Sequence, residues 1–205
     1  MSSVVDWTVP PASPDPVYGT GARREERGLA RLIAIGATAV VLFAAWMDAS
    51  VQWSGWQYAL AGALAFDLCG GVVANGLNSA KRDHFAPTSA LEARWWGRLV
   101  RRPAVFASVH IQPIAVAVLF PGASWWWGVG WYLVTLSSVV LVSWVPLYLA
   151  RPVALSVCVA TALTAPLVTS PAGFAWLPVV IVLKLTLAHA VREEPYRPVG
   201  VTAGG

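Results

Sequence analysis

Six long stretches of the chain consist mainly of apolar residues, and short polar or turn-forming segments separate them. The stretches cover residues 29–47, 53–78, 103–120, 125–149, 152–168 and 173–191. A helix rises about 1.5 Å per residue, so about 20 apolar residues cross a hydrocarbon core that is about 30 Å thick. The pattern predicts an all-α integral membrane protein, with residues 29–191 forming a bundle of six transmembrane helices joined by short outer loops.

The composition favours the same class of protein. Hydrophobic residues make up 57% of the chain and charged residues 12%, whereas soluble domains contain about one quarter charged residues. Residues 1–28 are rich in Pro, Ser and Gly and lack the layout of a cleaved signal, which predicts a flexible tail. Residues 192–205 predict a second, shorter tail. Cys69 and Cys158 lie inside apolar stretches without CxxC spacing, so neither a disulfide framework nor a thiolate zinc site is indicated.

The 14 Lys and Arg residues predict the orientation of the bundle. They lie before or at the start of the first stretch, in the loop 79–102, at Arg151 and after the sixth stretch, with Lys184 alone deep inside a stretch. Every alternate connection has none. The positive-inside rule therefore places both termini, the loop 79–102 and the turn at residues 150–152 in the cytoplasm, with the protein in the cell (inner) membrane.

Tryptophans indicate where the helices meet the two membrane surfaces. Most lie at predicted outer ends, where indole rings favour the interface: Trp53, Trp56, Trp125, Trp126, Trp127, Trp131 and Trp176. Trp95 and Trp96 instead lie in the basic loop 79–102, which predicts a short helix bound to anionic lipid headgroups. An ordinary basic loop is the alternative. Membrane lipids are the partners that these patterns indicate, and no pattern points to nucleic acid or to an oligomeric state.

The second stretch carries a face of small and polar residues. Steps of three and four from Asp67 reach Gly70, Gly71, Ala74, Asn75, Asn78 and Arg82. A neighbouring helix can approach such a face closely, so helix packing explains the glycines and asparagines without any function. Asp67 is different, because it lies about 16 Å along the helix from Asn78 and therefore near the middle of the membrane. A carboxylate at that depth needs a partner or a proton.

Lys184 is the candidate partner of Asp67. It precedes Arg192 by about 12 Å of helix, which places it within the cytoplasmic half of the sixth stretch. Its long side chain could reach Asp67 or extend alone to the membrane surface, and both alternatives remain open.

The three histidines, His84, His110 and His189, are all predicted on the cytoplasmic side. Together with Asp67, Glu193 or Glu194 they could bind a transition metal, although none of their spacings is that of a metal motif. A haem held by His110 and His189 is a weaker alternative. Pro113 predicts a kink that frees the carbonyl near residue 109, beside His110 and Gln112.

Three functional hypotheses follow, with no phosphate-binding GxxxxGK, GxSxG or HExxH motif to choose among them. The favoured one is a membrane-embedded enzyme or metal or redox protein with a polar pocket in the cytoplasmic half, acting on a lipid or other amphiphile. Asp67 and Lys184 would be its catalytic residues. Its substrate-binding residues would be Asn75, Asn78, Gln112 and Glu193. The alternatives are a small transporter or channel that uses the Asp67 and Lys184 pair, and a membrane scaffold without chemistry.

Overall fold

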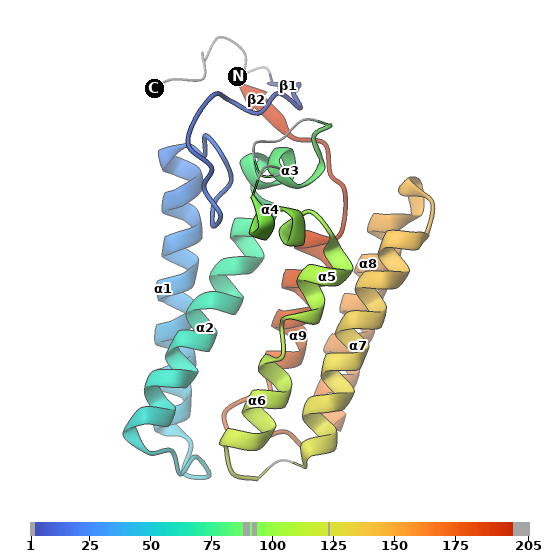
Figure 1. Cartoon of the computed structure of the whole chain (residues 1–205). Coiled ribbons are helices and arrows are strands. Elements are labelled where there is room, and N and C mark those ends of the chain that lie inside the picture. Colours follow the sequence, from blue (N-terminus) through green and yellow to red (C-terminus); the bar gives the residue numbers. More distant parts are fainter. Residues whose placement is uncertain (1–2, 88–90, 92–93, 123, 199–205) are drawn as a thin grey trace.

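The computed structural model describes residues 3–87, 91, 94–122 and 124–198, and it forms a bundle of helices (Figure 1). In this part of the chain, four helices are long and apolar enough to cross a membrane. They are α1 (Arg24–Met47), α2 (Gly55–Gly76), α7 (Trp125–Trp144) and α8 (Leu147–Thr164) with the adjoining 3₁₀ turn η2 (Ala165–Leu167). The chain is therefore a helical membrane protein. We call the end of the bundle near residues 3–5 and 196–198 the terminal end, and the other the opposite end.

Helices α1 and α2 pack along each other through small residues. A Cβ atom added at Gly70 would lie 2.7 Å from Cβ of Ala34, and one added at Gly62 would lie 3.3 Å from a methyl group of Leu42. The two backbones can therefore approach closely, as the small face of the second stretch predicted. Packing against α1 accounts for Gly70 and Gly62 without any further role.

The turn between the fourth and fifth apolar stretches is five residues earlier than the sequence indicated. Helix α7 ends at Trp144, and α8 begins at Leu147 after extended residues Val145 and Pro146. The residue before a proline is disfavoured in a helix, which explains a stop at Val145. Pro152 was expected to begin the fifth helix, and it lies within α8 instead. The predicted turn at residues 150–152 is therefore wrong.

The third and sixth stretches form shorter, interrupted helices. The third consists of α5 (Pro103–Ser108) and α6 (Gln112–Leu119), with a break beside His110 that confirms the kink predicted from Pro113. The sixth consists of α9 (Leu177–Val182) followed by a π-helix, η3 (Leu183–His189). Irregular backbone of this kind is tolerated inside a membrane bundle only where protein or a polar cavity surrounds it.

The second stretch was expected to be one helix to residue 78, but α2 ends at Gly76. Leu77 has φ −65° and ψ 145°, and a separate helix, α3 (Asn78–Phe85), follows at the terminal end. The loop 79–102 is therefore not simply an exposed basic loop. Residues of α3 pack into the molecule, with buried side chains at Ser79, Lys81, Arg82, Asp83 and His84. Helix α4 (Trp95–Val100) follows, with Trp95 exposed.

The segment before α1 is folded against the terminal end, in contrast to the flexible tail that the sequence predicted. Strand β1 (Ser3–Val5) pairs antiparallel with β2 (Tyr196–Pro198), so the second tail is structured here as well. Side-chain contacts hold both segments: Arg197 pairs with Asp6 at 2.9 Å, and Thr20 bonds to Asp83. The physical reason is long-range pairing, which the Pro, Ser and Gly content of the segment does not reveal.

Aromatic side chains close the opposite end of the bundle. The Trp53 ring contacts the rings of Phe120 and Phe174 at centroid distances of 5.3 and 5.0 Å. Trp53, Trp127 and Trp131 are buried in this layer, whereas Trp56, Trp125 and Trp126 are exposed. The sequence predicted that these six tryptophans lie at the membrane surface, but three of them, Trp53, Trp127 and Trp131, are part of the core.

Candidate functional site

Asp67 and Lys184 form an ion pair between α2 and η3. The Nζ atom of Lys184 donates a hydrogen bond to Oδ2 of Asp67 at 2.8 Å. The two side chains differ in accessibility, because 5% of the Lys184 side chain and 55% of the Asp67 side chain are exposed. The hypothesis that these two residues meet is therefore confirmed. The carboxylate lies at the surface of the bundle, with the amine of Lys184 behind it.

Gly71 provides the space through which Lys184 reaches Asp67. A Cβ atom added at Gly71 would lie 2.5 Å from Cε and 3.0 Å from Nζ of Lys184. Gly71 follows Asp67 by one helical turn, so both residues lie on the same face of α2. The lysine side chain thus crosses α2 at a residue that has no side chain, and only then meets the carboxylate.

The π-helix η3 brings Lys184 and His189 to one side of the sixth segment. In an α-helix, residues five apart point about 140° away from each other, because each turn contains about 3.6 residues. In a π-helix the backbone bonds link residue i to i+5, so such residues lie almost above one another. Lys184 and His189 are accordingly both buried, with exposures of 4% and 1%. π-Helical turns are rare and often occur at functional sites.

The three histidines are linked through one aromatic ring. The His84 and His189 rings lie 4.5 Å apart between centroids, so α3 and η3 bring this pair together. The ring of Phe106 on α5 stacks on His189 at 4.2 Å and contacts His110 at 4.5 Å. His110 Nδ1 donates a hydrogen bond to the carbonyl of Phe106 at 2.7 Å. Phe106 therefore lies between His110 and the inner histidine pair.

This arrangement does not fit the predicted metal or haem site. Within the described residues, no three or more His, Cys, Asp or Glu side chains are placed to hold a metal ion. His110 has its Nδ1 bonded to the backbone, and Phe106 occupies the space between His110 and His189 where a haem would lie. We therefore assign no metal or haem role to His84, His110 and His189.

Lys81 is a buried residue of this region that the sequence interpretation missed. Its Nζ donates hydrogen bonds to the carbonyls of Ala188 and Val191, the latter at 2.7 Å, and lies 3.9 Å from Glu193. Burial lowers the pKa of Lys81 to about 8, and Arg151 adds to the shift while Glu193 opposes it. The amine therefore satisfies carbonyls at the end of η3. Its position three residues after Asn78 on the small polar face was the available signal.

Burial controls the charge of the other ionisable groups on α3. Burial, together with the positive charges of Lys81 and Arg101, lowers the pKa of His84 to about 3. His84 is thus a neutral imidazole over the physiological pH range. Burial also raises the pKa of Asp83, against the effect of hydrogen bonds from Thr20. Lys81 and Asp83 are held by specific partners at the terminal end, so α3 is not a solvated basic segment.

The predicted substrate-binding residues separate into two groups. Asn75 is buried on α2, and its Nδ2 has no hydrogen-bond partner among the residues that the structure describes. Gln112 begins α6, next to the break at His110, and its Oε1 is buried and likewise without a described partner. Asn78 is different, because its Oδ1 accepts a bond from the Tyr196 amide at 2.8 Å and anchors β2.

Glu193 contacts basic residues at the terminal end and does not accompany the histidines. It pairs with Arg151 at 3.3 Å and with Lys81 at 3.9 Å. Helical spacing had suggested that it would accompany His189, but η3 ends at that histidine and the chain then turns away. Asn78 and Glu193 therefore hold the fold together at the terminal end, and neither belongs to the Asp67 site.

The remaining polar atoms indicate what the interior can bind. Several buried atoms on α2, α3 and η3 have no hydrogen-bond partner in the described part of the chain, among them Nδ2 of Asn75, Nδ1 of His84 and Oγ1 of Thr186. Buried polar atoms in folded proteins usually bond to water or to a ligand. Beside them, the Asp67 and Lys184 pair offers one carboxylate that can accept a proton and one amine that can donate one. Thr186 was not singled out from the sequence, which has no motif around it.

Comparisons with known proteins give no function for the chain, so any functional assignment depends on the residues described above. No protein-family model matches the chain, and no curated protein and no solved structure shows significant similarity to it.

Proposed function

We propose that the chain crosses the membrane six times, with both described ends in the cytoplasm. The antiparallel pairing of β1 with β2 supports an even number of crossings, because it holds the two ends together. Four long helices and two shorter apolar segments, Pro103–Leu119 and Leu177–His189, supply the six crossings. Arginines and lysines concentrate at the terminal end, which supports a cytoplasmic position for it.

Cysteine labelling tests this topology. In a variant without the native cysteines, Ser50→Cys lies in the exposed turn after α1 and should react with a membrane-impermeant maleimide in intact cells. Ser13→Cys lies in the exposed segment before α1 and should react only after the membrane is permeabilised. The reverse pattern, or labelling of both positions in intact cells, would overturn the proposed orientation.

Within this topology, we propose that the protein is a membrane-embedded enzyme that acts on a lipid or other amphiphile at Asp67 and Lys184. One observation carries the proposal: the Asp67 carboxylate is half exposed on the side of the bundle, and Lys184 lies buried behind it at 2.8 Å. A molecule in the bilayer can reach such a carboxylate sideways, without entering from water. The pair then provides a proton acceptor and a proton donor in a medium of low polarity, where acid–base groups are effective.

The difference in polarity between the two ends of the bundle favours a site that opens on one side over a transport path. The polar side chains of α3 and η3 lie toward the terminal end, whereas the rings of Trp53, Phe120 and Phe174 fill the opposite end. A carrier with alternating access needs a polar path on both sides of its site. The interrupted third and sixth segments favour transport as a second candidate, since such breaks line the sites of many transporters.

Turnover of membrane lipids tests the enzyme proposal. Purified protein in proteoliposomes made from total cell lipid should change the amount of at least one lipid class, measured by mass spectrometry. Asp67→Asn keeps the shape but cannot accept the proton, so the rate should fall by about 100-fold or more. Asp48→Asn is the matched control, because Asp48 is exposed at the opposite end and should leave the rate unchanged.

Two results would contradict the proposal. One is the absence of any lipid change with the wild-type protein, and the other is an equal rate for Asp67→Asn. If the wild-type protein instead dissipates a pH gradient across the vesicles and Asp67→Asn does not, transport replaces catalysis as the function.

A further inference from the structure

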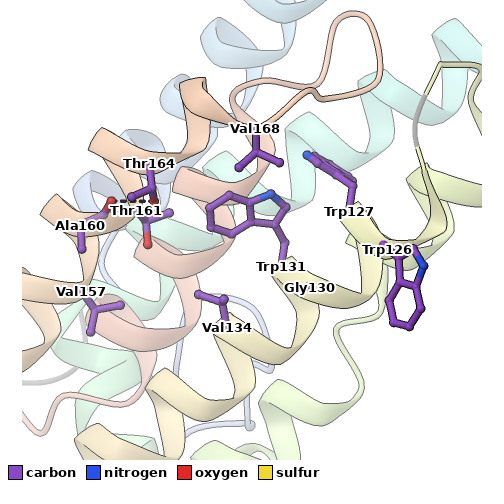
Figure 2. A pocket seen from close by; sticks show the side chains of 10 residues that line it. All are labelled: Trp126, Trp127, Gly130, Trp131, Val134, Val157, Ala160, Thr161, Thr164 and Val168. Atoms are coloured by element: carbon purple, nitrogen blue, oxygen red, sulfur yellow. Dashed lines mark hydrogen bonds between the residues drawn. The ribbon is translucent and has the colours of Figure 1, made fainter.

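An apolar pocket, chemically different from the Asp67 and Lys184 site, lies between α7 and α8 toward the opposite end of the bundle. Its volume is about 410 Å³, within the range of ligand sites in proteins. Figure 2 shows the residues that line it: Trp126, Trp127, Gly130, Trp131, Val134, Val157, Ala160, Thr161, Thr164 and Val168. Asp67 and Lys184 are not among them, so this pocket is separate from the proposed catalytic pair.

The walls of this pocket are almost entirely apolar, and one polar group stands out. The indole Nε1 of Trp127 is buried without a hydrogen-bond partner among the described residues, and Trp127 as a whole is 5% exposed. In Figure 2 its indole nitrogen is at the end of the ring that faces Trp131 and Val168. A buried indole N–H normally has an acceptor. The pocket therefore suits a ligand that is mostly hydrocarbon and carries one acceptor oxygen.

The position of the pocket identifies the source of that ligand. Both walls belong to helices that are long and apolar enough to cross a membrane, so bilayer lipid is within reach of the pocket. It begins within the first turns of α7, beside the exposed Trp125 and Trp126, and indole rings of membrane proteins collect at the level of the lipid headgroups. The ester groups of a glycerolipid lie close to that level, directly above their acyl chains.

We propose that this pocket binds one acyl chain of a glycerophospholipid, and that Trp127 donates a hydrogen bond to the ester carbonyl of that chain. The hydrocarbon lies along Val134, Val157 and Ala160, between the two helices. The rest of the lipid stays in the leaflet that surrounds the opposite end of the bundle. This proposal requires only that α7 and α8 span the membrane, so it stands independently of any chemistry at Asp67.

A substitution that fills the pocket with a larger side chain tests whether an acyl chain binds there. A Cβ atom added at Gly130 meets no atom within 4 Å, so Gly130→Leu can occupy the pocket without distorting the fold. Leucine also favours the helix more than glycine does. The matched control is Gly36→Leu on the exposed side of α1, where an added Cβ likewise meets nothing.

The probe is a phosphatidylcholine with a diazirine on one acyl chain, at low fraction in vesicles of phosphatidylethanolamine and phosphatidylglycerol. Photocross-linking to residues 157–168 should fall about tenfold in Gly130→Leu, because the leucine takes the volume of the chain. Gly36→Leu should match the wild type. Unchanged cross-linking in Gly130→Leu, or equal labelling of residues 157–168 and of α1 in the wild type, would overturn the proposal in favour of unspecific lipid contact.

A second comparison tests the hydrogen bond. The wild-type protein should cross-link an ester-linked phospholipid about fivefold more than an ether-linked one, which lacks the carbonyl. Trp127→Phe removes the donor and keeps an aromatic ring, so this preference should disappear. Trp144→Phe, at an exposed position of α7 that does not line the pocket, should retain it. No ester preference in the wild type, or an intact one in Trp127→Phe, would contradict the assigned role of Trp127.

Discussion

At the scale of single residues, two neighbouring glycines of α2 have different roles. Gly70 faces Ala34 of α1, and a methyl group there would push two packed backbones apart. Gly71 faces the flexible end of the Lys184 side chain. The three atoms nearest to a methyl group there all belong to that side chain, which can move. Of these two consecutive glycines, Gly70 therefore allows helix packing and Gly71 leaves space for the Lys184 side chain.

Substitution of Gly71 separates these roles. In Gly71→Ala the added methyl group displaces the Lys184 amine from Asp67, so the proposed lipid turnover should fall about as far as in Lys184→Met. Stability should change less than in Gly70→Ala, because the flexible lysine side chain can shift whereas two packed backbones cannot. In Gly70→Ala the helices must separate, which should cost about 1–3 kcal/mol.

Activity and the unfolding midpoint in detergent would be measured together for these variants. Gly76→Ala is the control, because an added Cβ there meets no atom within 4 Å. A fully active Gly71→Ala protein would show that the position of the Lys184 amine does not matter for function.

The buried imidazole of His84 predicts a loss of stability in acid. Its folded pKa is lowered from 6.5 to about 3, chiefly by burial, with Lys81 on the same helix and Arg101 adding to the shift. The unfolded chain therefore binds more protons between these two values. The stability that neutral His84 contributes is fully present above pH 6.5 and is lost as the pH falls toward 3.

The pH dependence of the melting temperature checks this prediction. His84→Phe keeps an aromatic ring against His189 and removes the titrating group, so its melting temperature should fall less steeply than that of the wild type below pH 6.5. Parallel curves for the two proteins would contradict the assignment.

At the scale of elements, the apolar pattern correctly indicated where helices form but not how they are interrupted. The kink at His110 could be predicted because Pro113 leaves a local signal. The π-helix η3 has no such signal, since KLTLAH is compatible with an ordinary helix. Helical steps from His189 therefore pointed to Glu193, whereas the π-turn aligns His189 with Lys184. The break at Leu77 similarly follows from the docking of α3, whose Asn78 bonds to Tyr196.

At the scale of the whole molecule, the segment before α1 and the segment after η3 together cover α3. Gly19 has φ +83°, and a Cβ atom there would lie 2.3 Å from the backbone nitrogen of Ala80, so only glycine allows this close approach. The next residue, Thr20, donates from its amide and its hydroxyl to Oδ2 of Asp83 at 2.6 and 2.8 Å. These contacts attach the N-terminal segment to the terminal end of the bundle.

Thr20 is therefore expected to control the exchange of this segment with solvent. Thr20→Val removes one hydrogen bond to a charged group, worth about 1.5–3 kcal/mol, while keeping the shape of the side chain. Hydrogen–deuterium exchange of residues 6–20 should become faster by about tenfold or more. The control Thr38→Val removes a hydroxyl that bonds only within α1 and should leave this exchange unchanged. Equal protection in Thr20→Val would mean that other contacts hold the segment.

The sequence alone determined the membrane class, the approximate positions of the apolar helices and the polar face of α2. These properties depend on composition and on the spacing of residues three or four positions apart, and both are visible in the sequence. It also identified Asp67 and Lys184 as candidates, because charges are costly in hydrocarbon wherever they lie. Only the tertiary structure decided that the two residues meet, that Gly71 makes room for the lysine and that Phe106 separates the histidines. Those facts depend on contacts between residues far apart in the chain, and on a π-turn that local periodicity does not encode.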